Sequence, residues 1–190
     1  MADVIVVGGG PAGLSAALFT GKNGLETIVF DTDETWMHKA HLFNYPGIRS
    51  IGGSEFMELT RGQVRDRGAE IREGEAVTDI ESGDDGFRIE TDDGEYEADY
   101  VVLATGADRS IAEDLEVAFD DEDTIDVDID METSVDGLYA TGAMVRAEEW
   151  QAVIAAGDGA SAALNILSRE KGEHFHDFDV PDDVPGHGSA

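Results

Sequence analysis

The residues whose types and spacing point most directly to chemistry lie near the amino terminus. Gly8, Gly10 and Gly13 have the G-x-G-x-x-G spacing and follow an apolar run at 4–7. Glycines at this spacing allow a tight turn, a close approach of the backbone to a pyrophosphate, and close packing of a helix on a strand. The pattern predicts a dinucleotide site with the pyrophosphate at the N-terminus of the following helix.

A carboxylate follows at the distance that such a site requires. A second apolar run, at 27–30, ends at Asp31, where an acid is expected to meet the adenosine ribose hydroxyls. The glycines alone also suit simple packing of a helix on a strand. Asp31 alone also suits a turn or a helix cap, because Asp33 and Glu34 lie beside it. The order of strand, turn, helix, strand and acid favours the nucleotide interpretation.

The elements that position these residues can be predicted from periodicity and turn signals. We expect a helix over 54–67, with Ser54 as N-cap, with Phe56, Met57, Leu59 and Val64 on its apolar side, and with Gly68 as its stop. Short strands at 70–72, 76–81, 86–91 and 95–97 predict a small antiparallel meander, with turns at 83–86 and 92–94. An apolar run at 100–103 predicts a buried parallel strand ending at Ala-Thr-Gly, and 138–142 repeats this pattern.

The carboxyl-terminal part is simpler. A long helix is expected at about 151–171, and these elements together form a single domain over 1–171. Residues 172–190 carry acids, prolines and glycines, which predicts an acidic, flexible tail.

Charge is the second strong feature of the 190-residue chain. Its 43 acidic and 12 basic residues give a formal charge of −31, which would repel itself strongly unless salt screens it. We interpret this as halophilic adaptation to a salt-filled cytoplasm, because the 41% of hydrophobic residues in periodic runs oppose acid-rich disorder. The charge argues against nucleic acid and anionic membranes as partners. Without a membrane-spanning run or a leader, we expect a cytoplasmic protein.

Other chemistry is poorly supported. The chain has no cysteine, which removes disulfides, thiolate metal sites and thiol redox chemistry of its own. The histidine pairs, at 38 and 41 and at 174 and 176, lack further ligands, and the acidic run at 120–123 lacks the ligand spacing of a calcium loop. We therefore predict no metal site. A Ser-His-Asp elbow and a Walker lysine are also absent.

Several motifs in order resemble a known family. These are the glycine turn at 8–13, Asn-Tyr-Pro-Gly at 44–47, Leu-Ala-Thr-Gly at 103–106, Gly-Leu-Tyr-Ala-Thr-Gly at 137–142, Trp-Gln-Ala-Val at 150–153 and Ala-Ala-Gly-Asp-Gly at 155–159. Up to about Lys171, the chain resembles the FAD domain of thioredoxin reductase-like pyridine-nucleotide flavoproteins. The resemblance implies an α/β fold of Rossmann-like type that binds FAD, with a parallel sheet, helices and a small antiparallel meander.

Two departures from the family pattern change the expected activity. The family inserts an NADPH-binding domain, which carries a Cys-x-x-C, after the Ala-Thr-Gly strand, whereas here only residues 107–114 separate Gly106 from Leu115. The resemblance therefore implies an FAD site and not thioredoxin reduction. The family also places an aspartate after the second Thr-Gly to bond the flavin. Ala143 stands there, and we expect either weaker flavin binding, by roughly 1.5–3 kcal/mol for a lost charged hydrogen bond, or a replacing group.

The resemblance also assigns roles to individual residues. The glycine turn with its helix would hold the pyrophosphate, Asp31 the adenosine ribose, and the backbone near Val77 the adenine edge. Turn or helix-start preferences alone would explain Asn44 and Gln151 equally well. The full set of implied cofactor-binding residues is Gly8, Gly10, Pro11, Ala12, Gly13, Asp31, Asn44, Val77, Thr105, Gly106, Gly142, Gln151 and Ala152, of which Asn44, Thr105, Gly106, Gln151 and Ala152 would lie along the ribityl chain and isoalloxazine. Catalytic residues cannot be named.

These observations lead to two functional hypotheses. The first is an FAD-dependent oxidoreductase that passes electrons between the flavin and an external donor or acceptor, which is NAD(P)H, a small quinone-like molecule or a carrier protein such as a ferredoxin. The second is a non-catalytic FAD- or nucleotide-binding module, or a subunit of a larger redox complex. The resemblance also implies a homodimer.

Overall fold

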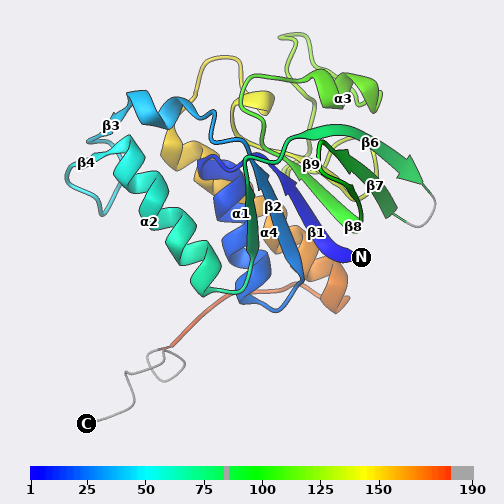
Figure 1. Ribbon diagram of the computed structural model, residues 1–190, viewed down its shortest axis with the longest axis horizontal. Helices are drawn as coiled ribbons and strands as arrows, with labels where there is room; N and C mark the ends of the chain where they lie inside the picture. Colours follow the sequence, from blue (N-terminus) through cyan, green and yellow to red (C-terminus); the bar gives the residue numbers. More distant parts are fainter. Residues whose placement is uncertain (84–85, 181–190) are drawn as a thin grey trace.

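The computed structural model describes residues 1–83 and 86–180. Its centre is a seven-stranded sheet with the strand order β5-β2-β1-β8-β7-β6, in which β9 also pairs with β8 (Figure 1). The strands are β1 (Ala2–Val7), β2 (Thr27–Asp31), β5 (Glu70–Glu73), β6 (Val77–Gly83), β7 (Gly86–Thr91), β8 (Glu95–Leu103) and β9 (Leu138–Ala140). β1, β2, β5, β8 and β9 form the parallel part, and β6, β7 and the first half of β8 form an antiparallel meander.

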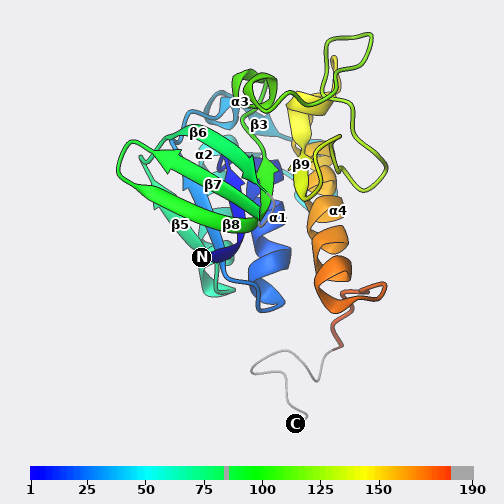
Figure 2. The same cartoon turned by 90° about the vertical axis from the view of Figure 1, so that its right-hand side faces the viewer.

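The helices cover one face of the parallel strands. α1 (Pro11–Lys22) and α4 (Ala152–Lys171) pack against each other, and α2 (Gly53–Asp66) lies beside α1 (Figures 1 and 2). Val4, Val6 and Val29 point into this helical layer, where they contact buried residues such as Leu14 and Met57. Alternate residues of β1 and β2 thus face the helical layer, and the residues between them face the other side of the sheet. Both sets are apolar, as expected for a sheet covered on both faces.

The opposite face of the sheet packs against the meander and the later loops. Ile5, Val7 and Phe30 lie in one core with Ile89 of β7 and with Ile125. Short elements complete the chain: the 3-10 helices η1 (Trp36–Lys39) and η2 (Gly142–Val145), the strand pair β3 (His41–Leu42) and β4 (Ile51–Gly52), and the helix α3 (Ser110–Asp114). The fold therefore has a meander layer, a parallel sheet and a helical layer. This confirms the predicted α/β, Rossmann-like class.

Several local predictions need correction. Ser54 is not the N-cap of α2, because the helix begins one residue earlier and Gly52 occupies the cap position. Leu59 is not on the buried side: its side chain is 61% exposed, whereas Phe56, Met57 and Val64 are buried. A helix-period pattern tolerates one apolar residue on the solvent face, because exposed leucines are common in folded proteins.

The strand predictions also need two corrections. The strand at 70–73 pairs in parallel with β2, so it is an edge of the main sheet and not part of the meander. The runs at 95–97 and 100–103 are one strand, β8, whose first half pairs antiparallel with β7 and whose second half pairs in parallel with β1 and β9. Of the turn predicted at 83–86, residues 84–85 lie outside the described residues.

The predicted tail is described only in part. Residues 181–190 of the predicted tail at 172–190 lie outside the described residues. In the described part, Asp177 and Asp179 form ion pairs with Lys22 at the end of α1, with Nζ–O distances of 2.7 and 2.5 Å. The backbone N–H of Phe175 donates to Ser168 of α4 over 3.0 Å. Residues 172–179 therefore have defined contacts with the helical layer.

Candidate nucleotide-binding site

A cleft of about 630 Å³ opens at the carboxyl ends of β1, β2, β8 and β9. This is the edge of a parallel α/β sheet at which ligands bind, and the volume is ordinary for a cofactor site. The predicted residues that line it are Gly8, Gly10, Pro11, Ala12, Asp31, Val77, Thr105, Gly106, Gly142, Gln151 and Ala152. The tertiary structure therefore gathers residues from distant parts of the sequence around one cleft.

The glycine turn contains glycines with different surroundings. A Cβ on Gly8, whose φ is +110°, would lie 2.3 Å from the Ala104 carbonyl oxygen, and one on Gly13 would lie 1.9 Å from the Gly8 carbonyl oxygen. Both positions are closed by packing, and Gly13 lies under the turn without lining the cleft. A Cβ on Gly10 would meet nothing nearer than the Thr35 hydroxyl, at 3.9 Å, so the space above Gly10 is open toward the cleft.

The N-terminus of α1 borders this open space. Its N-cap residue is Gly10, which offers no side-chain acceptor, and Pro11 occupies the first turn. The first-turn N–H groups of Ala12 and Gly13 have no acceptor within the helix, and the helix dipole places partial positive charge beside them. This geometry suits the pyrophosphate of a dinucleotide.

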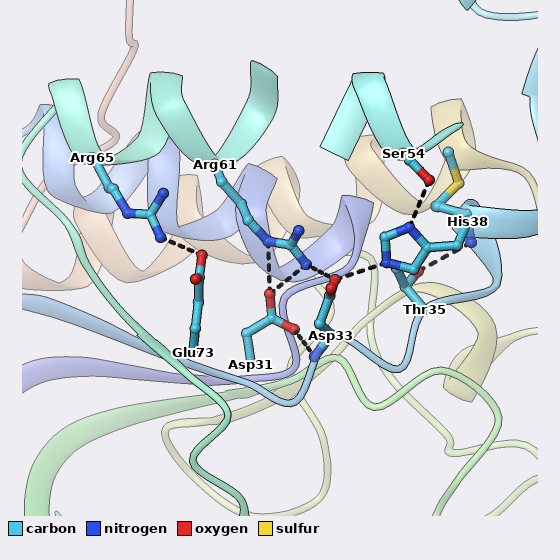
Figure 3. Close-up of polar contacts among 9 residues, drawn as sticks. Asp31, Asp33, Thr35, His38, Ser54, Arg61, Arg65 and Glu73 are labelled. Carbon is cyan, nitrogen blue, oxygen red and sulfur yellow. Dashed lines mark hydrogen bonds and ion pairs between the residues drawn. The ribbon is translucent and has the colours of Figure 1, made fainter. Parts of the chain in front are cut away.

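Asp31 lies at the end of β2 and is 3% exposed. Its Oδ2 accepts a hydrogen bond from Arg61 Nε at 2.9 Å, and Arg61 Nη2 lies 2.7 Å from the same oxygen (Figure 3). Its Oδ1 accepts the backbone N–H of Asp33 at 2.8 Å. Because a carboxylate has about four lone-pair sites, Asp31 retains room on Oδ1 for one further donor, such as one ribose hydroxyl.

Arg61 of α2 also holds the neighbouring acid. Its Nη2 contacts Asp33 Oδ1, and the same oxygen lies 2.8 Å from His38 Nε2, while His38 Nδ1 lies 2.9 Å from the Ser54 hydroxyl (Figure 3). The hydrogen bond to His38, followed by that to Arg61, lowers the pKa of the Asp33 carboxyl. Ser54, predicted to cap α2, instead connects that helix to η1 through His38.

Asn44 and Gln151, predicted from distant parts of the sequence, are in contact. Asn44 does not line the cleft, but its Nδ2 donates to Gln151 Oε1, which does, over 2.7 Å. The structure thereby brings together two residues that are 107 positions apart in the sequence. Ala143 lines the cleft where the family pattern has an aspartate. Its carbonyl oxygen and that of Met144 accept hydrogen bonds from Arg109, at 3.3 and 3.0 Å.

The charge of the lining is one-sided. No lysine, arginine or histidine is among the described residues that line the cleft. Its carboxylates are Asp31, Glu34, Glu75, Asp108, Asp114 and Glu149. A bound pyrophosphate would therefore depend on backbone N–H groups, the dipole of α1 and mobile cations, because no basic side chain of the described lining faces it.

Some lining residues were not predicted as site residues. They include Gly9, Thr35, Trp36, Glu75 and Trp150. Gly9 lies inside the motif, and a Cβ there would come within 2.1 Å of the Asp31 carboxyl group. The close approach of Asp31 therefore explains why this residue is a glycine. Trp36 and Trp150 are large aromatic residues outside any buried pattern, which is the signal that could have identified them.

Residues 1–83 and 86–180 contain neither a candidate metal centre nor a membrane-spanning helix. In that part of the chain, no three or more His, Asp and Glu residues form a group able to hold a metal ion. Over the same residues, every helix is too short or too polar to span a lipid bilayer.

The chain is an α/β protein of Rossmann-like fold, with a cleft at the carboxyl ends of its parallel strands. A family model described as pyridine nucleotide-disulphide oxidoreductase matches residues 2–52 and 47–160, so the chain belongs to this family. This confirms the family resemblance. Because the chain has no cysteine and joins Gly106 to Leu115 through 107–114 and α3, it carries neither the Cys-x-x-C nor the inserted NADPH domain of the thioredoxin reductase branch.

Curated relatives match the chain over about half of its length. It is 41% identical over 117 residues to the thioredoxin reductase of Treponema pallidum, a match that spans 56% of this chain and 36% of the relative. It is 34% identical over 108 residues to one component of the alkyl hydroperoxide reductase of Staphylococcus aureus, spanning 55% of this chain and 21% of the relative. The matched part thus covers well under two thirds of these relatives.

Solved structures show the same fold at lower identity. A thioredoxin reductase from Gloeobacter violaceus superposes with a TM-score of 0.84 at 20% identity, covering 94% of this chain and 99% of that one. A ferredoxin-flavin thioredoxin reductase from Clostridium acetobutylicum gives a TM-score of 0.79 at 20% identity, covering 90% and 99%.

Proposed function

We propose that the chain is an FAD-binding oxidoreductase that passes electrons between the bound flavin and an external donor or acceptor. The observation that carries this proposal is the cleft itself. The glycine turn, Asp31 and the two Thr-Gly segments line one cavity at the carboxyl ends of the parallel strands. Its opening above Gly10 leaves room for a pyrophosphate.

The residues present fit this cofactor in a defined order. Gly10 and Ala12 would meet the pyrophosphate, Asp31 one adenosine ribose hydroxyl, and the backbone near Val77 the adenine edge. Thr105, Gly106, Gly142, Gln151 and Ala152 would lie along the ribityl chain and isoalloxazine, with Asn44 orienting Gln151. When bound, the flavin supplies reversible uptake of two electrons and two protons, so that FADH2 and an acceptor A yield FAD and AH2.

The external partner is proposed to be NAD(P)H, a small quinone-like molecule or a carrier protein such as a ferredoxin. The connection at 107–114 covers less than an inserted domain would, which favours access to the flavin from solvent. We further propose a homodimer working in a salt-filled cytoplasm. Thiol exchange is not part of this function, because the chain has no cysteine.

The test is direct. Protein purified in molar potassium chloride is expected to carry FAD, or to take it up stoichiometrically, and to show a flavin spectrum that bleaches on anaerobic reduction. Release by heat and chromatography would identify the cofactor. Colourless protein that also fails to take up added FAD would overturn the proposal.

One observation favours the second candidate, a non-catalytic FAD- or nucleotide-binding module or a subunit of a larger redox complex. Apart from carboxylates, none of the described side chains that line the cleft is an obvious proton donor: no His, Lys or Tyr is among them. Steady-state turnover separates the two functions. FAD-loaded protein that cannot be reduced by any donor or reoxidised by any acceptor would support the module.

A further inference from the structure

Two exposed indoles lie at the cleft. Trp36 of η1 and Trp150, just before α4, have ring centroids 5.1 Å apart with planes inclined by 54°. Both line the cleft, yet they remain 59% and 42% exposed. The pair therefore offers flat aromatic surface toward a ligand and contributes little to the core.

The Trp150 indole is held by a side-chain hydrogen bond, and the Trp36 indole packs against it. Trp150 Nε1 donates to the Arg146 carbonyl oxygen over 2.9 Å, and the guanidinium group of Arg146 pairs with the buried Asp158 of α4 at 2.6 Å. Trp36 follows Thr35, whose hydroxyl accepts the backbone N–H of the buried Met37 at 3.3 Å. Because the Trp150 indole is already held, a planar ligand would lose little binding energy in ordering that side chain.

The charges around the pair restrict which planar ligand it can accept. Glu34 and Glu149 are near neighbours of the two indoles in the sequence and line the same cleft, together with Asp108 and Asp114. Basic groups in this region are engaged or outside the lining: Arg61 pairs with Asp31 and Asp33, Arg109 binds the Ala143 and Met144 carbonyls, and Lys39 of η1 does not line the cleft.

We propose that Trp36 and Trp150 form the docking platform for the external reactant, and that this reactant is a planar ring compound without negative charge. Aromatic stacking attracts any such ring, positive charge adds a cation–π attraction, and the surrounding carboxylates oppose anions. The inference rests on the proposed function and deepens it. Among the candidate reactants, it selects neutral quinone-like molecules over the anionic nicotinamide nucleotides and acidic carrier proteins.

Tryptophan fluorescence tests the platform directly, because these are the chain's 2 tryptophans. Menadione and its anionic counterpart, naphthoquinone sulfonate, are titrated into FAD-free and FAD-loaded protein at about 1 M potassium chloride. Quenching of free N-acetyltryptophanamide corrects for absorption and collision. We expect saturable quenching with menadione bound about tenfold more tightly than the sulfonate, and a ratio that falls as salt rises.

Variants separate the platform from the rest of the surface. Trp36→Ala and Trp150→Ala are each expected to weaken menadione binding by about fivefold, and Trp36→Phe and Trp150→Phe to restore most of it. Phe178→Ala, which removes another exposed aromatic residue from the tail, is expected to change nothing. The remaining tryptophan reports on binding in each single variant.

Distinct outcomes would overturn the inference. Equal binding of the neutral and sulfonated compounds at every salt concentration would show that the surrounding carboxylates do not select the ligand by charge. Unchanged menadione binding in both alanine variants would show that the indoles do not bind menadione. Competition between FAD and menadione would make the pair part of the cofactor site. Failure to take up FAD, measured separately, would instead overturn the proposed function on which the inference rests.

Discussion

At the scale of single residues, the motif glycines have different physical reasons for their type. Gly8 and Gly13 are closed by backbone atoms that an added Cβ would strike. Gly10 has an ordinary φ of −79° and open space above it, so a side chain there strains nothing in the protein. Packing within the fold explains Gly8 and Gly13, whereas the open space at Gly10 leaves room for the proposed ligand.

Gly10→Ala and Gly13→Ala are expected to separate these roles. Gly10→Ala should lower the melting temperature only modestly, because alanine is a poorer N-cap than glycine. It should weaken FAD binding at least about tenfold, or roughly 1.4 kcal/mol, because the methyl group occupies ligand space. Gly13→Ala should destabilise the fold by about 1–3 kcal/mol through overpacking. Thermal melts and FAD titrations measure both effects. Unchanged FAD affinity in Gly10→Ala would assign the whole turn to packing.

A second residue-scale prediction concerns Asp33, whose pKa lies below its ordinary value of 3.8 because of His38 and Arg61. A depressed pKa in the folded state stabilises the protein above pH 3.8, and this stabilisation is lost as the pH falls through the folded pKa. Asp33→Asn should therefore be less stable than wild type at neutral pH, with the difference shrinking as the pH falls below 3.8. Asparagine tolerates the φ of +59° at this position, so the backbone is matched.

The measurement is unfolding at a series of pH values in molar salt. Asp66→Asn, which changes an exposed carboxylate on the last turn of α2, is the charge-matched control. If the Asp33→Asn difference were the same at neutral and acidic pH, the hydrogen bonds to His38 and Arg61 would not be the source of the stabilisation.

At the scale of elements, residues 107–114, which follow β8, contribute one wall of the cleft. Residues 107–114 contain α3, whose Ala112 packs into the core beneath the meander. Arg109 joins this connection to η2 through the carbonyl oxygens of Ala143 and Met144. The Arg109 side chain thus joins two walls of the cleft. One of its acceptors belongs to Ala143, the position where the family pattern has an aspartate.

Arg109→Met is expected to lower the free energy of unfolding by about 1.5–3 kcal/mol, because it leaves two partly buried carbonyls without their charged donor. FAD binding should weaken as well, since Ala143 lines the cleft. The control is Arg72→Met, which removes only an exposed ion pair with Glu70 and should cost less than about 1 kcal/mol. Equal losses of stability in the two variants would contradict the role given to Arg109.

At the scale of the whole molecule, charge dominates. The excess of 43 acids over 12 bases remains even though several arginines are paired, for example Arg88 with Glu81, Glu90 and Glu95, and Arg169 with Glu132 and Asp136. Exposed ion pairs of this kind contribute little individually. The cleft has the same bias, so salt is expected to act on folding and on cofactor binding together.

The melting temperature is therefore expected to rise steeply with potassium chloride from low to molar concentration, by about 2–4 °C for each kcal/mol of repulsion that is screened. FAD affinity should rise over the same range, because cations replace the missing basic side chains beside the pyrophosphate. Paired melts of FAD-free and FAD-loaded protein separate these effects. A melting temperature that stays flat or falls with salt would show that self-repulsion does not limit stability.

Features of the fold that depend on neighbouring residues can be predicted from the sequence, whereas pairing between distant strands cannot. The strands at 4–7 and 27–30, the glycine turn and the long final helix follow from local periodicity and turn chemistry, and the structure contains each of them. The sequence places the strand at 70–73 wrongly in the meander, because its polar residues, Glu-Ile-Arg-Glu, do not indicate which neighbour it pairs with. The sequence predicts two strands where the structure has the single strand β8. Its hydrophobic pattern changes at the point where its pairing partner changes from β7 to β1 and β9.

By itself the sequence determined the family, the α/β class, the absence of thiol chemistry and the charge, since each depends on residue types at fixed spacing. Only the tertiary structure decided that Arg61 binds Asp31, that Asn44 meets Gln151, and that the two tryptophans lie together at the cleft. Arg61 and Asp31 are 30 positions apart, and Asn44 and Gln151 are 107 positions apart. Neither of these pairs, nor the pair of tryptophans, has a local sequence pattern that indicates the contact. Their meeting depends on how helices and loops pack onto the sheet, and that packing is a property of the whole chain.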